Sequence, residues 1–109
     1  MLFAVATKDG KEVNQHFGHA ERFLIYDVEE ERVRLVDERA VERYCTFDPD
    51  HPMRSHTLQG TADVLRDCQA VVCAMIGEAP QIELARIGVQ AFAVEGEIKS
   101  VLQALVKVI

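Results

Sequence analysis

The sequence predicts a three-layer α/β domain, in which helices cover both faces of a mixed five-stranded sheet. The first forty residues hold three strand-like segments, and the second half alternates apolar strand-like runs with helical segments. Strands joined through a helix require crossover connections and parallel pairing, whereas strands joined by a tight turn pair antiparallel. The expected element order is βββαβαβα, and 109 residues suit one domain spanning residues 1–109.

Three strands are expected in the first part of the chain. Residues 2–6 are a short apolar run closed by a turn signal at residues 8–10, which predicts a central strand. Residues 22–28 are rich in aromatic and β-branched side chains and predict a second strand. Residues 32–36 alternate as a half-buried strand does, so a polar turn at 29–31 should close a hairpin.

The middle of the chain is expected to be a loop followed by a helix. Residues 41–54 show no period and contain Pro49 and Pro52, which predicts an irregular loop. Ser55 can cap a helix that runs to about Asp67.

The last third of the chain alternates strands and helices. Residues 70–76 form a continuous apolar run, typical of a strand covered on both faces, so Cys73 and Met75 are expected in the core. Pro80 falls in the first turn of a helix that stops at Gly88. A last strand over 89–94 and a closing helix over 97–107 follow.

Charge and cysteine usage exclude several classes of protein. The net charge is −6 with no Lys/Arg cluster, which disfavours a nucleic-acid partner. The three cysteines have no CxxC spacing and no signal peptide precedes them, which indicates free thiols in a cytoplasmic protein. The apolar run at residues 70–77 is too short to span a membrane.

The segment 14–20 is the first candidate for chemistry. His16 and His19 stand three residues apart around Gly18, between the first strand and the hairpin. Neutral imidazole binds iron, zinc or copper, and a glycine lets a bulky ligand approach the backbone. The alternative is that His16 caps a turn and His19 is merely exposed, because two histidines at this spacing are weak support for a metal site.

A second group of candidates lies further along the chain. Cys45 opens the irregular loop that also holds His51, and His56 follows it; a thiolate with histidines favours soft or borderline metals. The alternative is an acidic surface loop with an incidental cysteine. Gly77 precedes a helix N-terminus, which can bind anions through free N–H groups, although no nucleotide-binding pattern is present.

A catalytic site is not expected, since neither a GxSxG nor an HExxH motif occurs. The alternative is a metal-dependent hydrolase in which Asp9, Asp27, Asp63 and Asp67 converge. For Asp63 and Asp67, exposure on one helix is the simpler interpretation.

The run VNQHFGHAERF at residues 13–23, followed by IYDV at 25–28, resembles the dinitrogenase iron–molybdenum cofactor biosynthesis family. Within that family the chain is most similar to the NifX-type C-terminal domain of NifB proteins. The likeness covers nearly the whole chain and continues in further blocks: Tyr44-Cys45, residues 67–71, Ile76-Gly77 with Pro80, Leu84-Ala85 and residues 87–89. The sequence TFDPDHP at residues 46–52 departs from the glycine-rich stretch expected after Cys45.

The resemblance implies a ribonuclease H-like fold without nuclease chemistry, and binding of an iron–sulfur cluster or an iron–molybdenum cofactor precursor as cargo. It implies contacts to that cargo from His16, Phe17, Gly18, His19 and Cys45, with His16, His19 and Cys45 as metal ligands through the bound cluster. The predicted function is therefore a non-enzymatic binder or carrier, monomeric or weakly dimeric, that serves cofactor-assembly proteins of the nitrogenase type. The alternatives are a mononuclear metal or regulatory module that uses the two loop histidines, and the hydrolase considered above.

Overall fold

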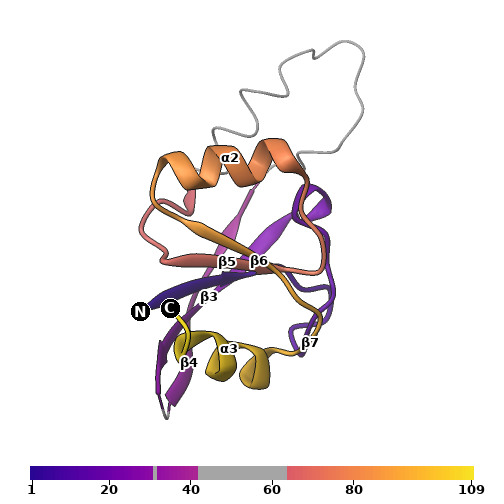
Figure 1. Cartoon of the computed structure of the whole chain (residues 1–109). Coiled ribbons are helices and arrows are strands. Elements are labelled where there is room, and N and C mark those ends of the chain that lie inside the picture. The colour runs from indigo at the N-terminus through magenta and orange to yellow at the C-terminus, as the bar shows by residue number, and fades with distance from the viewer. Residues whose placement is uncertain (31, 42–63) are drawn as a thin grey trace.

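The computed structural model describes residues 1–30, 32–41 and 64–109. Among these residues, a five-stranded sheet forms the middle layer, with one helix against each face (Figure 1). The strands follow the order β4-β3-β1-β5-β6 across the sheet. Their bounds are β1 Leu2–Val5, β3 Arg22–Glu29, β4 Arg32–Ala40, β5 Ala70–Cys73 and β6 Gln90–Ala93.

The sheet is mixed, as predicted. Strand β1 lies at its centre, antiparallel to β3 and parallel to β5. Strand β4 pairs antiparallel with β3, which confirms the hairpin, and β6 pairs parallel with β5. Strand β3 therefore runs against the other four, and β4 continues to Ala40, beyond the end expected at residue 36.

Helix α2 (Glu78–Arg86) and helix α3 (Ile98–Val106) cover opposite faces of the sheet. Because side chains alternate along a strand, each sheet strand supplies both faces. The side chains that form the core with α2 include Ala4, Phe23, Ile25, Val71 and Leu84. The side chains that form the core with α3 include Phe3, Val5, Tyr26, Val72 and Leu102. This arrangement confirms the three-layer α/β prediction.

The two helices in the described part of the chain begin and end close to their expected positions. Pro80 occupies the first turn of α2. The helix ends at Arg86, and Gly88, two residues later, has a φ of +79°. Helix α3 begins at Ile98, one residue after its expected start. No helix in the described ranges is long and apolar enough to cross a membrane. The helix predicted from Ser55 falls mainly on residues 42–63, which lie outside the described ranges.

Two expectations are wrong. Strand β5 ends at Cys73 and not at residue 76, and Met75 is 58% exposed instead of buried in the core. The reason is that residues 74–76 leave the sheet and bond to the histidine segment. A second sheet that was not predicted joins β2 (Glu12–Val13) to β7 (Gly96–Glu97).

Candidate functional site

The histidine segment folds into one short 3₁₀ turn, Phe17–His19, preceded by His16 in an extended conformation. The Phe17 ring is buried and lies against the Phe23 ring, with centroids 5.6 Å apart. Gly18 is also buried, whereas both imidazoles are exposed. Phe17 thus anchors the turn in the core, while the two histidine side chains face solvent.

Backbone hydrogen bonds fasten this turn to the segment after β5. The Phe17 N–H donates to the Met75 carbonyl oxygen at 2.9 Å, and the Ala74 N–H donates to the Gln15 carbonyl oxygen at 2.9 Å. His16 and Met75 form an isolated parallel bridge there. Two segments far apart in the sequence are therefore joined where β5 ends.

The two imidazole rings stack in parallel. Their centroids lie 5.4 Å apart and their planes differ by 6°. The His19 N–H donates to the His16 carbonyl oxygen at 3.1 Å, which closes the turn and brings the two side chains to the same side. The rings therefore offer neighbouring nitrogen ligands, but the two rings do not converge on one point in space.

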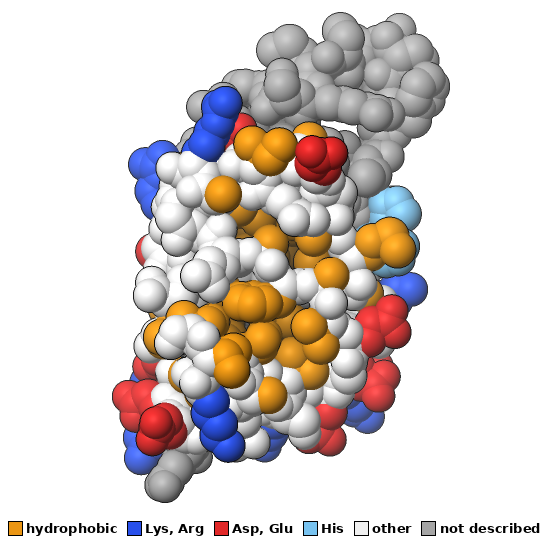
Figure 2. Space-filling view, in the orientation of Figure 1, with side chains coloured by type: hydrophobic (Ala, Val, Ile, Leu, Met, Phe, Trp, Pro, Cys, Tyr) orange, Lys and Arg blue, Asp and Glu red, His pale blue; other side chains and the backbone are white. Residues whose placement is uncertain are grey.

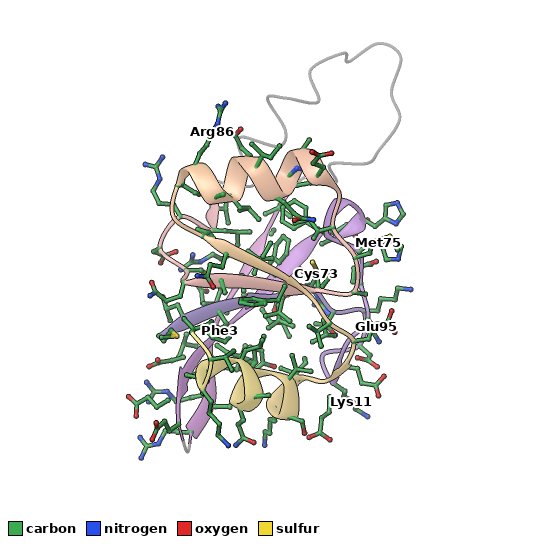
Figure 3. All side chains as sticks on the ribbon, viewed as in Figure 1. Phe3, Lys11, Cys73, Met75, Arg86 and Glu95 are labelled. Carbon is green, nitrogen blue, oxygen red and sulfur yellow. The ribbon has the colours of Figure 1, made fainter. Side chains whose placement is uncertain are left out.

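Both histidines line a hollow of about 320 Å³ in front of the α2 N-terminus. Met75, Ile76, Gly77 and Pro80 line it as well, and Figure 3 shows Met75 projecting outward while Cys73 lies in the interior. His19 also borders a second hollow, of about 460 Å³, whose lining includes Lys8. An occupant of the first hollow would meet imidazoles on one side, and on the other an apolar surface that also carries the Glu78 carboxylate.

Gly77 stands at the N-cap of α2 with ordinary extended backbone angles, φ −74° and ψ 168°. A Cβ atom built there would meet only the Pro80 ring, at 3.7 Å, an ordinary contact distance. The backbone therefore does not require glycine at this position. Gly77 lines the hollow together with Pro80, so a side chain at position 77 would add to the wall of the hollow.

Met75 is a site residue that the sequence interpretation missed. Its thioether borders the same hollow as both imidazoles. A thioether is a soft ligand, suited to soft or borderline metals. The available signal was a sulfur atom directly before Ile76-Gly77, but it stood inside a run that was assigned to a strand.

Cys73 is buried, as expected, and so is Cys68. Burial raises the pKa of the Cys68 thiol to about 11 and that of the Cys73 thiol to about 12. Both thiols therefore stay protonated near neutral pH, whereas metals bind the thiolate. Neither of them is a candidate ligand.

The other candidate ligands do not gather with the histidines among the described residues. Cys45, His51 and His56 lie outside the described ranges. Within those ranges no group of three or more His, Cys, Asp or Glu side chains could hold a metal ion.

Three of the four carboxylates considered for a hydrolase lie in the described ranges, and each of these three has local partners. Asp9 accepts hydrogen bonds from the backbone N–H groups of Lys11 and Glu12. Asp27 pairs with the terminal amino group, and Asp67 with Arg39. Asp63 lies outside the described ranges.

Comparison with known proteins adds the family. The family model described as dinitrogenase iron-molybdenum cofactor matches residues 1–108. The FeMo cofactor biosynthesis protein NifB of Azotobacter vinelandii is 39% identical over 90 residues, covering 83% of this chain and 18% of that protein. NifB of Rhizobium meliloti is 36% identical over 107 residues, covering 96% of this chain and 21% of that protein. The chain thus spans about a fifth of the length of these relatives.

Two solved structures have a similar fold. The crystal structure of PH0822 superposes with a TM-score of 0.69, at 23% identity, covering 98% of this chain and 91% of that one. The protein mj0327 of Methanocaldococcus jannaschii gives a TM-score of 0.62 at 15% identity, covering 98% and 88%. Their likeness agrees with the mixed sheet and its two covering helices. The family match over residues 1–108 shows that the chain belongs to the dinitrogenase iron-molybdenum cofactor family.

Proposed function

We propose that this chain binds an iron–sulfur-type precursor of an iron–molybdenum cofactor and hands it on without catalysing a reaction. The observation that carries the proposal is the pair of exposed, parallel imidazoles of His16 and His19 on a turn anchored by Phe17. These two rings are the proposed metal ligands. The family supports the class of cargo, because the relatives in it are FeMo cofactor biosynthesis proteins.

The number of ligands favours a preassembled cluster over a single metal ion. A zinc site takes three or four protein ligands. The described residues bring two imidazoles together and gather no third His, Cys, Asp or Glu with them. A cluster carries its own sulfides and can be held by few protein ligands, and few ligands also make release easier. Both properties suit a carrier.

The wall of the hollow supports the same cargo. Met75 offers a soft sulfur, while Ile76 and Pro80 provide apolar surface beside the imidazoles. Phe17 and Gly18 serve this site from beneath, as buried residues of the turn that carries the rings. We further propose that the Cys45 thiolate adds one ligand, so that the cluster is still held by few protein ligands.

The partners follow from the cargo. We propose that cofactor-assembly proteins of the nitrogenase type deliver it and accept it, in the cytoplasm. Such transfer requires that donor and acceptor reach the exposed edge of the cluster. The outward position of both imidazoles suits that requirement.

Anaerobic titration of the purified apo-protein with a reconstituted iron–sulfur precursor tests the proposal. Visible absorption should follow binding, and His16→Ala and His19→Ala should each weaken affinity by about 10- to 100-fold or more. Because protons compete with metals for imidazole nitrogen, affinity should also fall on acidification from pH ~8 to ~5.5.

Cys73→Ala is the control. It removes a buried thiol and leaves a small cavity, so it should lower the free energy of unfolding and leave affinity unchanged. Tight, colourless binding of Zn²⁺ without binding of the precursor would favour the mononuclear alternative. Undiminished precursor binding by both histidine variants would refute the ligand assignment.

A further inference from the structure

The two edges of the sheet differ in chemistry. At one edge, β4 carries five charged residues: Arg32, Arg34, Asp37, Glu38 and Arg39. At the other edge, residues 89–94 read VQAFAV, without a charge or a proline. Proteins usually protect sheet edges with charges, prolines or bulges, because a bare edge can pair with another strand. The β6 edge has none of these protections.

The free hydrogen-bonding groups of β6 can be identified from its bonds to β5. The Gln90 N–H donates to Gln69 at 3.1 Å, and the Val94 N–H donates to Cys73 at 2.8 Å. Backbone groups alternate in direction along a strand, so the N–H and C=O groups of Ala91 and Ala93 point to the outer side. Among the described residues no strand pairs with that side.

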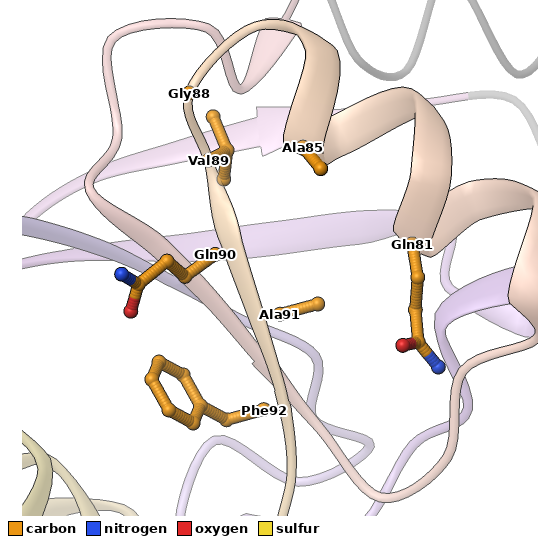
Figure 4. Close-up of a pocket in the computed structure, with 7 residues that line it drawn as sticks. All are labelled: Gln81, Ala85, Gly88, Val89, Gln90, Ala91 and Phe92. Atoms are coloured by element: carbon orange, nitrogen blue, oxygen red, sulfur yellow. The ribbon is translucent and has the colours of Figure 1, made fainter.

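Side chains around this edge leave an apolar surface. A hollow of about 510 Å³ runs along β6 beside α2, where Ala91 points toward Gln81 while Phe92 points to the opposite side of the strand (Figure 4). Helix α3 packs toward β3 and β4, and Phe92 is only half-buried. Val94 is 38% exposed, and Figure 2 shows apolar side chains gathered between the two helices.

We propose that β6 pairs antiparallel with β6 of a second copy of this chain, about a twofold axis at Phe92. In this register Ala91 lies opposite Ala93 of the other copy, and the two exchange N–H···O=C bonds in both directions. Phe92 faces its own counterpart as a non-hydrogen-bonded pair, and Gln90 faces Val94. Small residues therefore meet small residues, and a ring meets a ring, which is a favourable cross-strand pair.

The absence of charge along β6 allows a second copy of the chain to pair at this edge. The chain carries a net charge of −6, so two copies repel each other on average. The strand Gln90–Ala93 with its neighbour Val94 forms an uncharged stretch in which no like charges would be opposed. A twofold interface uses the same patch on both partners, so a patch that complements itself is sufficient. A short strand with flanking apolar surface lies at the small end of interface sizes, so the dimer should dissociate reversibly on dilution.

Sedimentation equilibrium over a range of concentrations tests the pairing. The parent chain should form a concentration-dependent dimer, and Ala93→Glu should raise its dissociation constant by about 10-fold or more, because each new carboxylate would face Ala91 of the other copy and repel its diagonal counterpart. Ala40→Glu is the matched control, since it makes the same change at an exposed position of the opposite edge strand and should leave dimerisation unchanged. A parent chain that stays monomeric, or an Ala93→Glu variant that dimerises as before, overturns the proposal.

Disulfide trapping tests the register. A non-hydrogen-bonded antiparallel pair places its Cα atoms about 4.5 Å apart, within the range a disulfide can bridge. Phe92→Cys should therefore form a covalent dimer on oxidation. Val94→Cys should not, because its neighbour in the other copy is Gln90. Equal cross-linking of both variants overturns the register, and this outcome is independent of whether the chain carries a cluster.

Discussion

At the scale of single residues, the site combines side chains that the sequence reveals with one that it hides. The histidines stand out because two imidazoles flank a glycine, and the structure sets their rings in parallel. Phe17 belongs to the same motif, yet its ring is buried against Phe23. A local motif shows which residues are unusual but not which way each side chain points. For Met75 the apolar run gave the wrong answer, because an exposed sulfur and a buried one look alike in sequence.

Met75→Leu tests the thioether. Leucine keeps the apolar volume and removes the sulfur, so the free energy of unfolding should change by less than about 1.5 kcal/mol. Affinity for the iron–sulfur precursor should fall if the sulfur contacts a metal atom. Urea denaturation and anaerobic titration measure the two quantities on one preparation. Unchanged affinity would show that Met75 contributes apolar surface only.

At the scale of elements, apolar runs, residue composition, the alternation over residues 32–36 and the turn signals predicted the sheet strands and the hairpin. The end of β5 was not predictable, because Ala74, Met75 and Ile76 continue the apolar run after the sheet has ended. What ends the strand is a pair of hydrogen bonds to the histidine segment, a contact between distant parts of the chain. The second sheet was not predictable either, because its strands Glu12–Val13 and Gly96–Glu97 are too short to show a period and lie far apart in the sequence.

Two glycines flank α2. Substituting each one separates an effect of backbone conformation on stability from an effect of the hollow on binding. Gly88 has φ of +79° with no atom within 4 Å of a built Cβ, so Gly88→Ala should cost about 1 kcal/mol of stability through its backbone alone. Gly77 has ordinary angles and borders the hollow, so Gly77→Ala should leave stability nearly unchanged and weaken precursor binding.

Thermal denaturation and titration of both variants separate the two roles. Loss of affinity in Gly88→Ala together with full affinity in Gly77→Ala would contradict this division. Each variant serves as the control for the other, because one is expected to change stability and the other affinity.

At the scale of the whole molecule, the three-layer architecture was predictable because the order of elements leaves few arrangements of the sheet. The two sheet edges were not distinguished, because the β4 charges and the bare β6 edge acquire meaning only once strand order is known. The site was predictable only in its loop. Its opposite wall comes from the α2 N-terminus, and only the fold brings the two together.

The dependence of stability on pH is also a property of the whole molecule. A hydrogen bond from Arg39 lowers the pKa values of Asp37 and Asp67, and backbone N–H groups of Lys11 and Glu12 lower that of Asp9. In the folded state these carboxyl groups hold protons less readily than in the unfolded state. They therefore contribute stability above the ordinary aspartate pKa of about 3.9, and this stability is lost as pH falls below it.

The buried thiols act at the alkaline end. Burial raises the pKa values of Cys68 and Cys73 from 9.0 to about 11 and about 12, so above pH 9 the unfolded chain loses protons that the folded chain retains. The free energy of unfolding should therefore decline above pH 9 as well as below pH ~4. Urea denaturation across this range measures it. Cys68→Ala should reduce the alkaline decline, and an unchanged decline would assign it to other groups.

The hydrogen bonds from Phe17 to Met75 and from Ala74 to Gln15 bear on how fast the proposed cargo binds and leaves. They fix the backbone that carries both imidazoles when the protein folds, so little ordering of this turn remains to be done when cargo arrives. Binding should then be limited by encounter, and departure by the breaking of metal–nitrogen bonds. Under the proposed function, a partner protein would take the cluster by ligand substitution at its exposed side and leave this turn in the shape that accepts the next one.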